Sequence, residues 1–491
     1  MNPASRVPPP RRSPRRTLLR LASVGLAAVA VLSSAALAGQ ASAAKGKLEL
    51  GILDETLESN DSQTRTLAFD RTVAGGANIA VLYADWRGIA QSTPENPTDP
   101  SDPAYAWGQL DRAVVDATAR GLRAMVVLYR APDYAEGAHP PANVSEGTWR
   151  PSPAKLGEFA TATATRYSGS FPNPATPGTS LPRVALWQVW AEPNIPRGLW
   201  PQSERRKGEW RHASPTRYRR MLDAAYKAIK GVSRSNTVIT AGTAPFGDYV
   251  RRAKRIPPLR FWREVFCVRG KKLHKARCPG PRPRFDVLAH NTLPAQREPW
   301  ADAMEIGGGP DDLTVPDMKK LQRLLRKARA RKAIRSPRRT PLWATELLWV
   351  SDPPTRGGVS PGLQADYLAD ALYLLWRQRV STVIWVKIVD PARGSTDFAS
   401  GLHFNDWTAK PAFTAFRFPF VALRERGKLK VWGKAPAPGT VEIQRQDGGG
   451  WTTVTSLSTG ASNIFTGNLP PGGGTFRAVS GAEASLSRSV G

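Results

Sequence analysis

Eight short apolar runs alternate with stretches of helical periodicity, and this alternation restricts the fold more than any other feature of the sequence. A strand-like run followed by an amphipathic stretch is typical of βα units, which place their strands in one parallel sheet. The predicted strands are Leu48–Leu53, Asn78–Tyr83, Leu122–Tyr129, Val184–Trp190, Thr237–Ala241, Phe285–His290, Leu342–Thr345 and Thr382–Ile388. Eight such units favour a closed (β/α)₈ barrel, a TIM barrel, over an open sheet.

The stretches between the runs support this interpretation. Asp111–Ala119, Pro316–Lys332 and Ala365–Arg377 each carry apolar residues on one helical face, and a last helix is predicted near Lys410–Phe416. From about Val421 onward, short strands separated by Gly- and Pro-rich turns predict a small β-sandwich. Its strands are predicted at Lys428–Trp432, Thr440–Gln444, Trp451–Ser456, Ile464–Leu469 and Thr475–Ala478. This part either stabilises the barrel or binds carbohydrate or cell wall.

The first 43 residues have the composition of a targeting signal. A basic start precedes the apolar run Leu21–Leu37, and Ala41-Ser42-Ala43 supplies the small residues of a cleavage site. The pair Arg15-Arg16 resembles a twin-arginine signal, although Arg-rich Sec signals are similar. An uncleaved anchor is the alternative, but the run is shorter than the roughly 20 residues of a spanning helix. We therefore expect residues 1–43 as a signal peptide, 44–420 as the barrel, 421–491 as the sandwich, and a secreted or cell-wall-associated protein.

Charge and cysteine content indicate the environment of the exported chain. The formal charge is +30, and removal of the six signal arginines leaves +24, which favours an anionic neighbour. The only two cysteines, Cys267 and Cys278, flank a short basic loop, and an oxidising compartment makes a disulfide between them plausible. No His or Asp cluster joins them, so no metal site is expected there.

Two basic runs concentrate this charge on the stretches after the fifth and sixth strands. One is Arg251–Arg284, which includes Lys271, and the other is Lys319–Arg339. Neighbouring helices of a barrel would place both runs on the outer wall. The resulting surface either holds an anionic envelope polymer or acidic polysaccharide, or is a solvated basic face. No nucleic-acid-binding motif is present, and export makes nucleic acid an unsuitable partner.

Two predicted strands end in glutamates at positions suited to chemistry. The fourth is followed by Glu192 and the seventh by Glu346. Reactive residues of such barrels lie at the carboxyl ends of the strands, and a carboxyl beside an apolar strand is costly unless it is used or paired. Hydrolysis of a glycosidic bond needs two carboxyls, one as acid and one as nucleophile or base. The alternative is that each glutamate forms a structural ion pair with an arginine.

The segments around these glutamates resemble the clan A glycoside hydrolases, namely the cellulase superfamily and relatives of the xylosidase/iduronidase family. The resemblance rests on Glu192-Pro193-Asn194, on Thr345-Glu346 before an aromatic residue, and on Asp85-Trp86, His290 and Trp385. It extends over roughly residues 48–420. It implies that Glu192 is the acid/base and Glu346 the nucleophile of a retaining hydrolase of β-linked saccharides that needs no metal or organic cofactor.

Substrate contacts are expected from aromatic and polar residues at the strand ends, since aromatic faces stack on sugar rings. The candidates are Trp86, Trp190, Asn194, Trp200, His290, Trp349 and Trp385. His290 is expected either to bond Glu346 or to be a satisfied core histidine. By alternation, Trp187 and Trp343 are expected to point away from the barrel axis into the core.

Three positions depart from the clan pattern. Ala191 stands where the clan usually has a sugar-binding Asn, Val81 where it has an Arg, and Thr292 where it often has a Tyr. Arg130 is a candidate replacement for the missing cation. Two further hypotheses therefore remain open, a catalytically silent sugar-binding barrel and a wall-adhering structural protein.

Overall fold

The computed structural model describes residues 46–491 except 271 and 393, so the predicted signal peptide and Lys271 lie outside the described residues. Eight parallel strands form one sheet in the order β10-β11-β12-β1-β2-β3-β4-β7. A parallel bridge between Ile239 and Val287 joins β7 to the segment that enters β10, which closes the sheet into a barrel. The sequence-based prediction of a (β/α)₈ barrel is confirmed.

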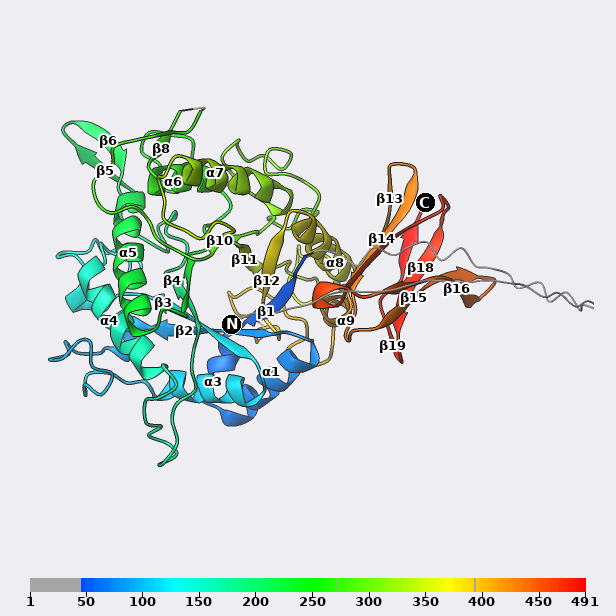
Figure 1. The fold of residues 1–491 in the computed structure, drawn as a ribbon, viewed down its shortest axis with the longest axis horizontal. Helices are drawn as coiled ribbons and strands as arrows, with labels where there is room; N and C mark the ends of the chain where they lie inside the picture. Colours follow the sequence, from blue (N-terminus) through cyan, green and yellow to red (C-terminus); the bar gives the residue numbers. More distant parts are fainter. Residues whose placement is uncertain (1–45, 271, 393) are drawn as a thin grey trace, which may run out of the picture. The chain divides into compact units, whose positions relative to one another are not determined.

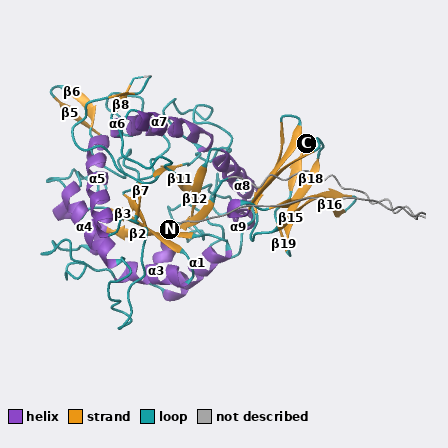
Figure 2. Ribbon diagram, viewed as in Figure 1, coloured by secondary structure: helices purple, strands orange, loops and turns teal. Residues whose placement is uncertain are grey.

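The barrel strands overlap all eight predicted runs. They are β1 (Glu49–Leu53), β2 (Ile79–Asp85), β3 (Arg123–Tyr129), β4 (Leu186–Val189), β7 (Thr237–Thr240), β10 (Leu288–Asn291), β11 (Leu342–Leu347) and β12 (Val380–Val386). The helices between them ring the strands in Figures 1 and 2. They are α1 (Ser62–Ala74), α2 (Trp86–Ile89), α3 (Gly108–Ala119), α4 (Pro153–Arg166), α5 (Ser214–Val232), α6 (Pro258–Val265), α7 (Met318–Ala330), α8 (Pro361–Arg377) and α9 (Pro411–Arg417).

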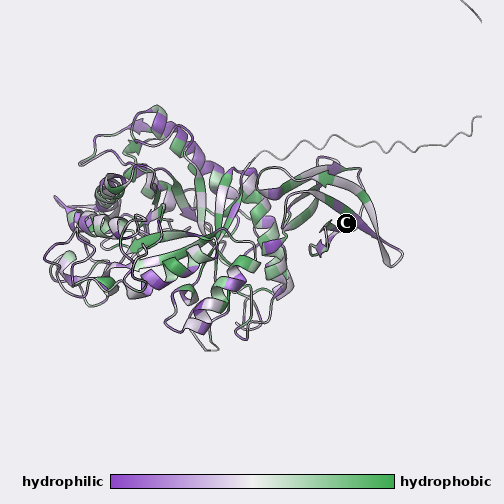
Figure 3. Cartoon of the chain, turned by 60° about the horizontal axis from the view of Figure 1, so that its bottom comes forward, coloured by the Kyte–Doolittle hydropathy of each residue, from purple (hydrophilic) through white to green (hydrophobic). Residues whose placement is uncertain are grey.

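Side-chain alternation divides the apolar core into two layers. One cluster draws its members from the strands alone and fills the barrel interior, for example Ile79, Val81 and Ile384. The larger cluster lies between the strands and the helices, with Ala80 and Leu82 from the same strand β2. Successive strand residues point to opposite faces, so each strand feeds both layers. In Figure 3 the central strands are largely hydrophobic, whereas the outer helices carry many hydrophilic residues.

Two antiparallel sheets follow the barrel and confirm the predicted β-sandwich. One has the order β13-β14-β17 and the other β16-β15-β18-β19, with β20 beside β18. Their strands are β13 (Phe420–Glu425), β14 (Lys428–Lys434), β15 (Thr440–Asp447), β16 (Gly450–Ser458), β17 (Ile464–Leu469), β18 (Gly474–Ser480), β19 (Glu483–Ala484) and β20 (Arg488–Val490). Phe420, Val431, Ile443, Phe465 and Phe476 belong to their shared core.

The sandwich also contacts helix α8. Trp432 of β14 packs on Tyr373 and Trp376, with ring centroids 5.5 and 5.8 Å apart. Arg488 of β20 bonds Asp370, with Nη2 and Oδ1 2.7 Å apart. These contacts are consistent with a stabilising role for the sandwich.

Two short hairpins were not predicted, β5 (Ser203–Arg206) with β6 (Glu209–His212), and β8 (Val268–Arg269) with β9 (His274–Lys275). Both are rich in charged residues, so hydrophobic periodicity gave no signal for them. Among residues 46–491 as described, no helix combines the length and the apolar character that crossing a bilayer requires.

Candidate active site

Glu192 and Glu346 come together at the carboxyl ends of the barrel strands. Glu346 belongs to β11, whereas Glu192 lies three residues beyond the end of β4. The chain turns sharply after β4, because Trp190 and Glu192 adopt left-handed φ values of 74° and 40°. The Glu192 amide then donates to the Gly242 carbonyl at 3.0 Å, which fixes the turn against the end of β7.

Asn291 is the polar residue that both glutamates share. Its Nδ2 donates to Oε1 of Glu192 at 3.0 Å, and its Oδ1 accepts from the Thr345 hydroxyl at 2.9 Å. In the barrel ladder Asn291 is the partner of Glu346. Hydrogen bonding by this amide lowers the pKa of each glutamate. Asn291 thus supplies from β10 an amide beside the carboxyl pair, whereas the clan pattern has an Asn at the position of Ala191.

Gly242, just beyond β7, leaves the space that Asn291 occupies. A Cβ at this position would stand 1.9 Å from Oδ1 of Asn291 and 2.4 Å from Oγ1 of Thr345. No side chain fits there while Asn291 keeps its position. Neither residue could be recognised from the sequence pattern. The predicted sixth strand ended at His290, one residue before Asn291, and nothing local in the sequence marks the role of Gly242.

Burial and mutual repulsion set the protonation of the glutamate pair. Burial raises the pKa of Glu192, against the lowering effects of Asn291 and Arg197. Burial, and next the negative charge of Glu192, raise the pKa of Glu346 to about 8. Two carboxyls that interact this strongly titrate as a unit, and like charges resist simultaneous ionisation. Burial and mutual repulsion thus favour retention of a proton on the pair, the state that acid-assisted displacement requires.

Two tyrosines from the barrel interior lie beside this pair. Tyr83 of β2 and Tyr129 of β3 have ring centroids 6.1 Å apart, and the Tyr129 hydroxyl donates to the Arg197 carbonyl at 2.9 Å. Burial and then the charge of Glu346 raise the pKa of Tyr83, while burial raises that of Tyr129 to about 12. Both phenols stay neutral; the Tyr129 proton is used on the Arg197 carbonyl, so only Tyr83 can donate a hydrogen bond into the site. Their positions on the inward face of the strands are the sequence signal that could have identified them.

Further carboxyls, which no sequence pattern indicated, follow β1. Asp54 accepts from the Ile388 amide at 2.6 Å, and burial raises its pKa to about 6. Glu58 accepts from the Tyr83 amide at 3.0 Å, and burial raises its pKa to about 8. Lys387, which follows β12, forms an ion pair with Glu55. Several carboxyls thus lie together near the start of the barrel sequence, in a chain that is strongly basic overall.

Arg130 does not replace the arginine that the clan pattern has at the position of Val81. Its Nε donates to Oδ1 of Asp85 at 3.0 Å, so its charge is neutralised at the end of β2. Val81 itself is 1 % exposed and packs inside the barrel. The cation whose field reaches both glutamates is Arg197, in the loop after β4.

His290 contacts other partners than Glu346. Its Nδ1 lies 2.9 Å from the Thr243 hydroxyl and its Nε2 lies 3.0 Å from the Leu313 carbonyl. The ring is fully buried, and burial lowers its pKa to about 4. The prediction of a His290–Glu346 bond is wrong, and the alternative of a satisfied core histidine describes the residue.

Asn194 is a structural residue and not a free sugar contact. Its Nδ2 donates to the carbonyls of Ala244 and Ile256, both at 3.0 Å, and its Oδ1 accepts from the Ala244 amide at 2.8 Å. The side chain is fully buried. The amide therefore ties the loop after β4 to the one after β7, and the predicted substrate contact is wrong.

Four predicted sugar-stacking tryptophans are buried instead. Trp86, Trp190, Trp349 and Trp385 are at most 1 % exposed, whereas Trp200 is only partly buried. Trp86 stacks on Phe159 at 5.3 Å between ring centroids. A ring enclosed on both faces cannot receive a sugar.

Strand parity explains the error at Trp385. Its neighbour Ile384 points into the barrel, so Trp385 points outward and stacks on Trp349 at 6.3 Å. The prediction for Trp187 agrees with the structure, because this ring packs in the layer between strands and helices. Trp343 belongs to the interior cluster, so the expectation that it points away from the axis is wrong.

The other two departures also have defined positions. Ala191 is buried beside the turn that carries Glu192. Thr292 is buried, and its amide donates to the Glu346 carbonyl at 2.8 Å. Thr292 therefore supports the Glu346 backbone and adds no phenol to the site.

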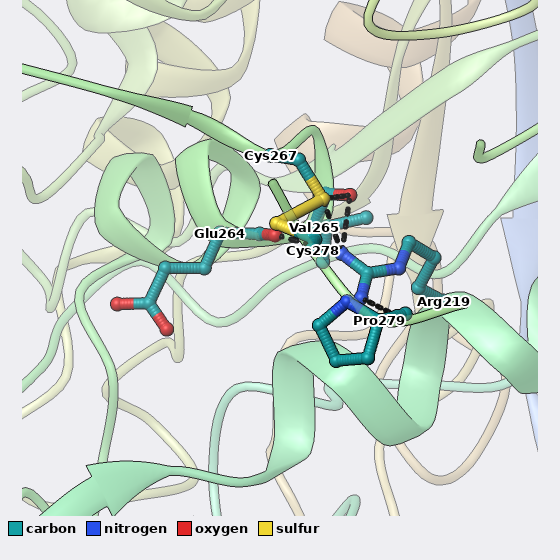
Figure 4. The surroundings of a disulfide bond; sticks show 6 residues. All are labelled: Arg219, Glu264, Val265, Cys267, Cys278 and Pro279. Atoms are coloured by element: carbon teal, nitrogen blue, oxygen red, sulfur yellow. Dashed lines mark hydrogen bonds between the residues drawn. A yellow bond between two sulfur atoms is a disulfide. The ribbon is translucent and has the colours of Figure 1, made fainter. Parts of the chain in front are cut away.

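A disulfide joins Cys267 to Cys278, with Cα atoms 5.9 Å apart (Figure 4). Arg219 of α5 lies beside it and donates to the Glu264 carbonyl at 3.2 Å. The bridge closes the hairpin β8–β9 within the first basic run. In the described part of the chain, no three His, Cys, Asp or Glu side chains are grouped so that they could hold a metal ion.

Comparison with known proteins supports the fold through structure alone. No protein-family model matches the sequence, and no match is found among curated proteins. Among solved structures, the chain is similar to a family 39 glycoside hydrolase from the gut symbiont Bacteroides cellulosilyticus, with 16% identity, a TM-score of 0.51, and coverage of 86% of this chain and 79% of that one.

Two further solved structures are similar at lower scores. A monomeric beta-xylosidase from Caulobacter crescentus has 14% identity and a TM-score of 0.48 over 88% of this chain and 95% of its own. A glucosidase from Croceicoccus marinus has 14% identity and a TM-score of 0.47 over 82% and 76%. The structural neighbours are thus glycoside hydrolases, and the likeness to the family 39 enzyme shows that this chain shares its fold.

Proposed function

We propose that this chain is a retaining glycoside hydrolase that cleaves β-glycosidic bonds of an oligosaccharide or polysaccharide. One observation carries the proposal: two half-buried glutamates at the carboxyl ends of β4 and β11 meet at the Asn291 amide, and the pKa of each is raised. Glycoside hydrolysis uses a pair of carboxyl groups of this kind, one protonated and one ionised, as its catalytic groups. A structural ion pair for each glutamate is disfavoured, because no ion pair of Glu192 or Glu346 occurs among the described residues.

The reaction would proceed by double displacement. Glu346 attacks the anomeric carbon while Glu192 protonates the departing glycosidic oxygen, so one C–O bond forms as another breaks. Glu192, now ionised, takes a proton from water. The resulting hydroxide attacks the same carbon and releases Glu346 with net retention.

The division of roles follows the resemblance to clan A enzymes, with Glu192 as acid/base and Glu346 as nucleophile. Tyr83, as a neutral donor beside the pair, is suited to stabilise the ionised carboxylate. The chemistry uses only side chains of this chain and water.

Export is part of the proposal and rests on the sequence alone. Residues 1–43 have the basic start, apolar run and small-residue cleavage site of a signal peptide. The protein would then act outside the cell or at the cell wall.

A panel of aryl β-glycosides tests the proposal. Wild-type protein should release the phenol from at least one sugar, and NMR should show the β-anomer as the first product. First release of the α-anomer would contradict retention. No cleavage across the panel, with binding of the same sugars, would favour a silent sugar-binding barrel, the alternative supported by Ala191 and Val81 at positions of usual contacts.

A further inference from the structure

Helix α7 carries an unbalanced positive charge. Its thirteen residues include six basic side chains and no acidic one: Lys319, Lys320, Arg323, Arg326, Lys327 and Arg329. Like charges spaced three and four residues apart destabilise a helix. An apolar stripe of Leu321, Leu324 and Leu325 holds α7 against the barrel, while four of the basic residues face solvent.

Cavities lie on both sides of this helix and share Arg323. The first, of about 420 Å³, lies where α7 meets the end of α8, and its lining within the described part of the chain consists of Lys, Arg and Gln side chains, including Lys319, Arg326 and Arg379. The second, of about 610 Å³, lies toward α6 and the disulfide-closed hairpin, with Lys320 and Lys327 on its wall. We call these two cavities, together with the α7 side chains between them, the α7 groove. The two basic runs meet here, as the sequence predicted.

Few carboxylates compensate this charge. Lys320 pairs with Asp317 at 2.7 Å, Arg377 with Glu425 at 3.0 Å, and Arg263 with Asp311. Among the described residues, no ion pair is formed by the rest of the groove, namely Lys319, Arg323, Arg326, Lys327 and Arg379. No Asp or Glu lines either cavity in the described part of the chain. Concentrated, uncompensated positive charge attracts anions strongly.

The floor of the first cavity is rigid. Gln378 accepts from the Lys319 amide at 3.1 Å and donates to the Val315 carbonyl at 2.7 Å, so it locks the start of α7 to the end of α8. The backbone that carries the surrounding cations is therefore fixed, although their side chains are exposed.

The groove is remote from the glutamate pair. Arg379 directly precedes Val380, and Val380 pairs with Leu342, the first residue of β11. Glu346 lies four residues farther along the same strand, toward the opposite end of the barrel. A polymer in the groove would leave the carboxyl face open.

We propose that the α7 groove binds a linear polymer of phosphodiester repeats, such as a polyol phosphate. Arginine presents paired donors that match phosphate oxygens, and two cavities in succession suit successive charges of a chain. Among the residues that the structure describes, no aromatic side chain lines either cavity, so these provide no platform for stacking a sugar ring. Recognition by charge alone favours a polyol phosphate over an acidic polysaccharide. Through it the protein would adhere to an anionic envelope polymer.

The test compares two triple charge reversals in the intact protein. The groove variant reverses three of its charges, by Lys319→Glu, Arg323→Glu and Arg326→Glu. The control variant reverses three exposed charges elsewhere, by Arg112→Glu, Arg234→Glu and Lys428→Glu, so both variants change the net charge equally. Labelled poly(glycerol phosphate) is titrated by fluorescence anisotropy at several salt concentrations, and polygalacturonate of matched length serves as the carboxylate probe. Circular dichroism verifies folding, and a Gln triple at the groove positions replaces the Glu triple if that variant unfolds.

The groove variant should lose at least tenfold in affinity for poly(glycerol phosphate). The slope of log K plotted against log salt concentration should become shallower by about 2, because each of the three lost phosphate contacts contributes about 0.7. The control variant should stay within about threefold of wild type. Three results would each overturn the proposal: equal losses of affinity in both variants, tight binding of polygalacturonate by the wild type, or no binding of the phosphate polymer by the wild type. Cleavage of a small aryl glycoside is measured in parallel and should be the same in all three proteins.

Discussion

The carboxyl face of the barrel and the α7 groove differ in the sign and the burial of their charged side chains. At the carboxyl face, Glu192 and Glu346 are half-buried, meet at Asn291, and have raised pKa values because burial disfavours their charged forms. In the groove, exposed cations such as Arg323 and Arg326 stand together with few partners. Burial makes each glutamate individually decisive, because desolvation shifts its pKa. Exposed cations are screened, so they act only as a group. The net charge of +30 reflects basic surfaces such as the groove and gives no sign of the carboxyl pair.

Substitution of one carboxyl of the pair, Glu346, should have the largest effect. Glu346→Gln keeps the shape of the side chain but cannot form a glycosyl intermediate, so turnover should fall by about 10⁴-fold or more on every substrate. The same change removes a buried carboxyl that repels Glu192, so the melting temperature should not fall. Steady-state rates and a thermal melt check both expectations. Unchanged turnover would remove Glu346 from the mechanism.

Changing the other carboxyl should have a smaller and partly reversible effect. Glu192→Ala removes the general acid, which typically contributes about 10²–10⁴-fold. A dinitrophenyl glycoside needs no proton on its leaving group, so its first step should survive. Added azide should then restore turnover and yield a β-glycosyl azide of retained configuration, identified by NMR. Equal losses on good and poor leaving groups would contradict the assigned role.

The shared amide can be displaced without touching either carboxyl. Gly242→Ala places a methyl group where Asn291 now lies, and the expected loss in kcat is about 10- to 100-fold, as for other small misplacements of catalytic groups. Asn291→Ala should lower kcat in the same range. Gly231→Ala is the matched control, because nothing lies within 4 Å of its added Cβ. Activity of Gly242→Ala equal to that of this control would show that Asn291 has no part in the reaction.

The pH dependence of the rate reports the shared proton. The active form carries one proton on the pair, so kcat/KM should fall as pH rises through about 8, where Glu346 and its partner lose it. The fall should approach about tenfold per pH unit, with a second decline in acid when both carboxyls are protonated. Glu192→Ala should abolish the alkaline decline. A wild-type rate that stays flat from pH 6 to 10 would contradict a shared proton.

The disulfide should affect the groove and spare the carboxyl face. Cys267→Ala with Cys278→Ala frees the hairpin whose Gly270 and Leu273 line the second cavity. The expected cost is about 2–3 kcal/mol of stability, with weaker poly(glycerol phosphate) binding and unchanged kcat. Thiol titration of the unreduced, denatured protein should find no free thiol. Two free thiols per chain would show that the bridge does not form.

Much of the barrel could be predicted because burial on both faces makes each strand a continuous apolar run. Leu122–Tyr129 and Thr237–Ala241, for example, coincide with β3 and β7 to within one residue. The two glutamates were recognisable because carboxyls are unusual beside such runs. The charged hairpins lacked this signal, and they were missed.

The environment of the glutamates was predicted less well, because it depends on strand parity and on loops. The register of β10 shifts between His290 and Asn291, so Asn291 and not His290 meets the pair. Gly242 and Arg197 reach the site from loops after β7 and β4, at distances that sequence spacing does not encode. The tryptophans were assigned by their position at strand ends without regard to which face they occupy.

The most direct test of the central claim is to trap the covalent intermediate. The wild-type protein is incubated with dinitrophenyl 2-deoxy-2-fluoro-β-glycosides of several sugars, and its peptides are then mapped by mass spectrometry. Our account predicts a single added fluoroglycosyl group on Glu346, with loss of activity in step with labelling and no labelling of Glu346→Gln. A label on another residue, or cleavage of the parent glycosides that gives the inverted product and no label, would contradict it.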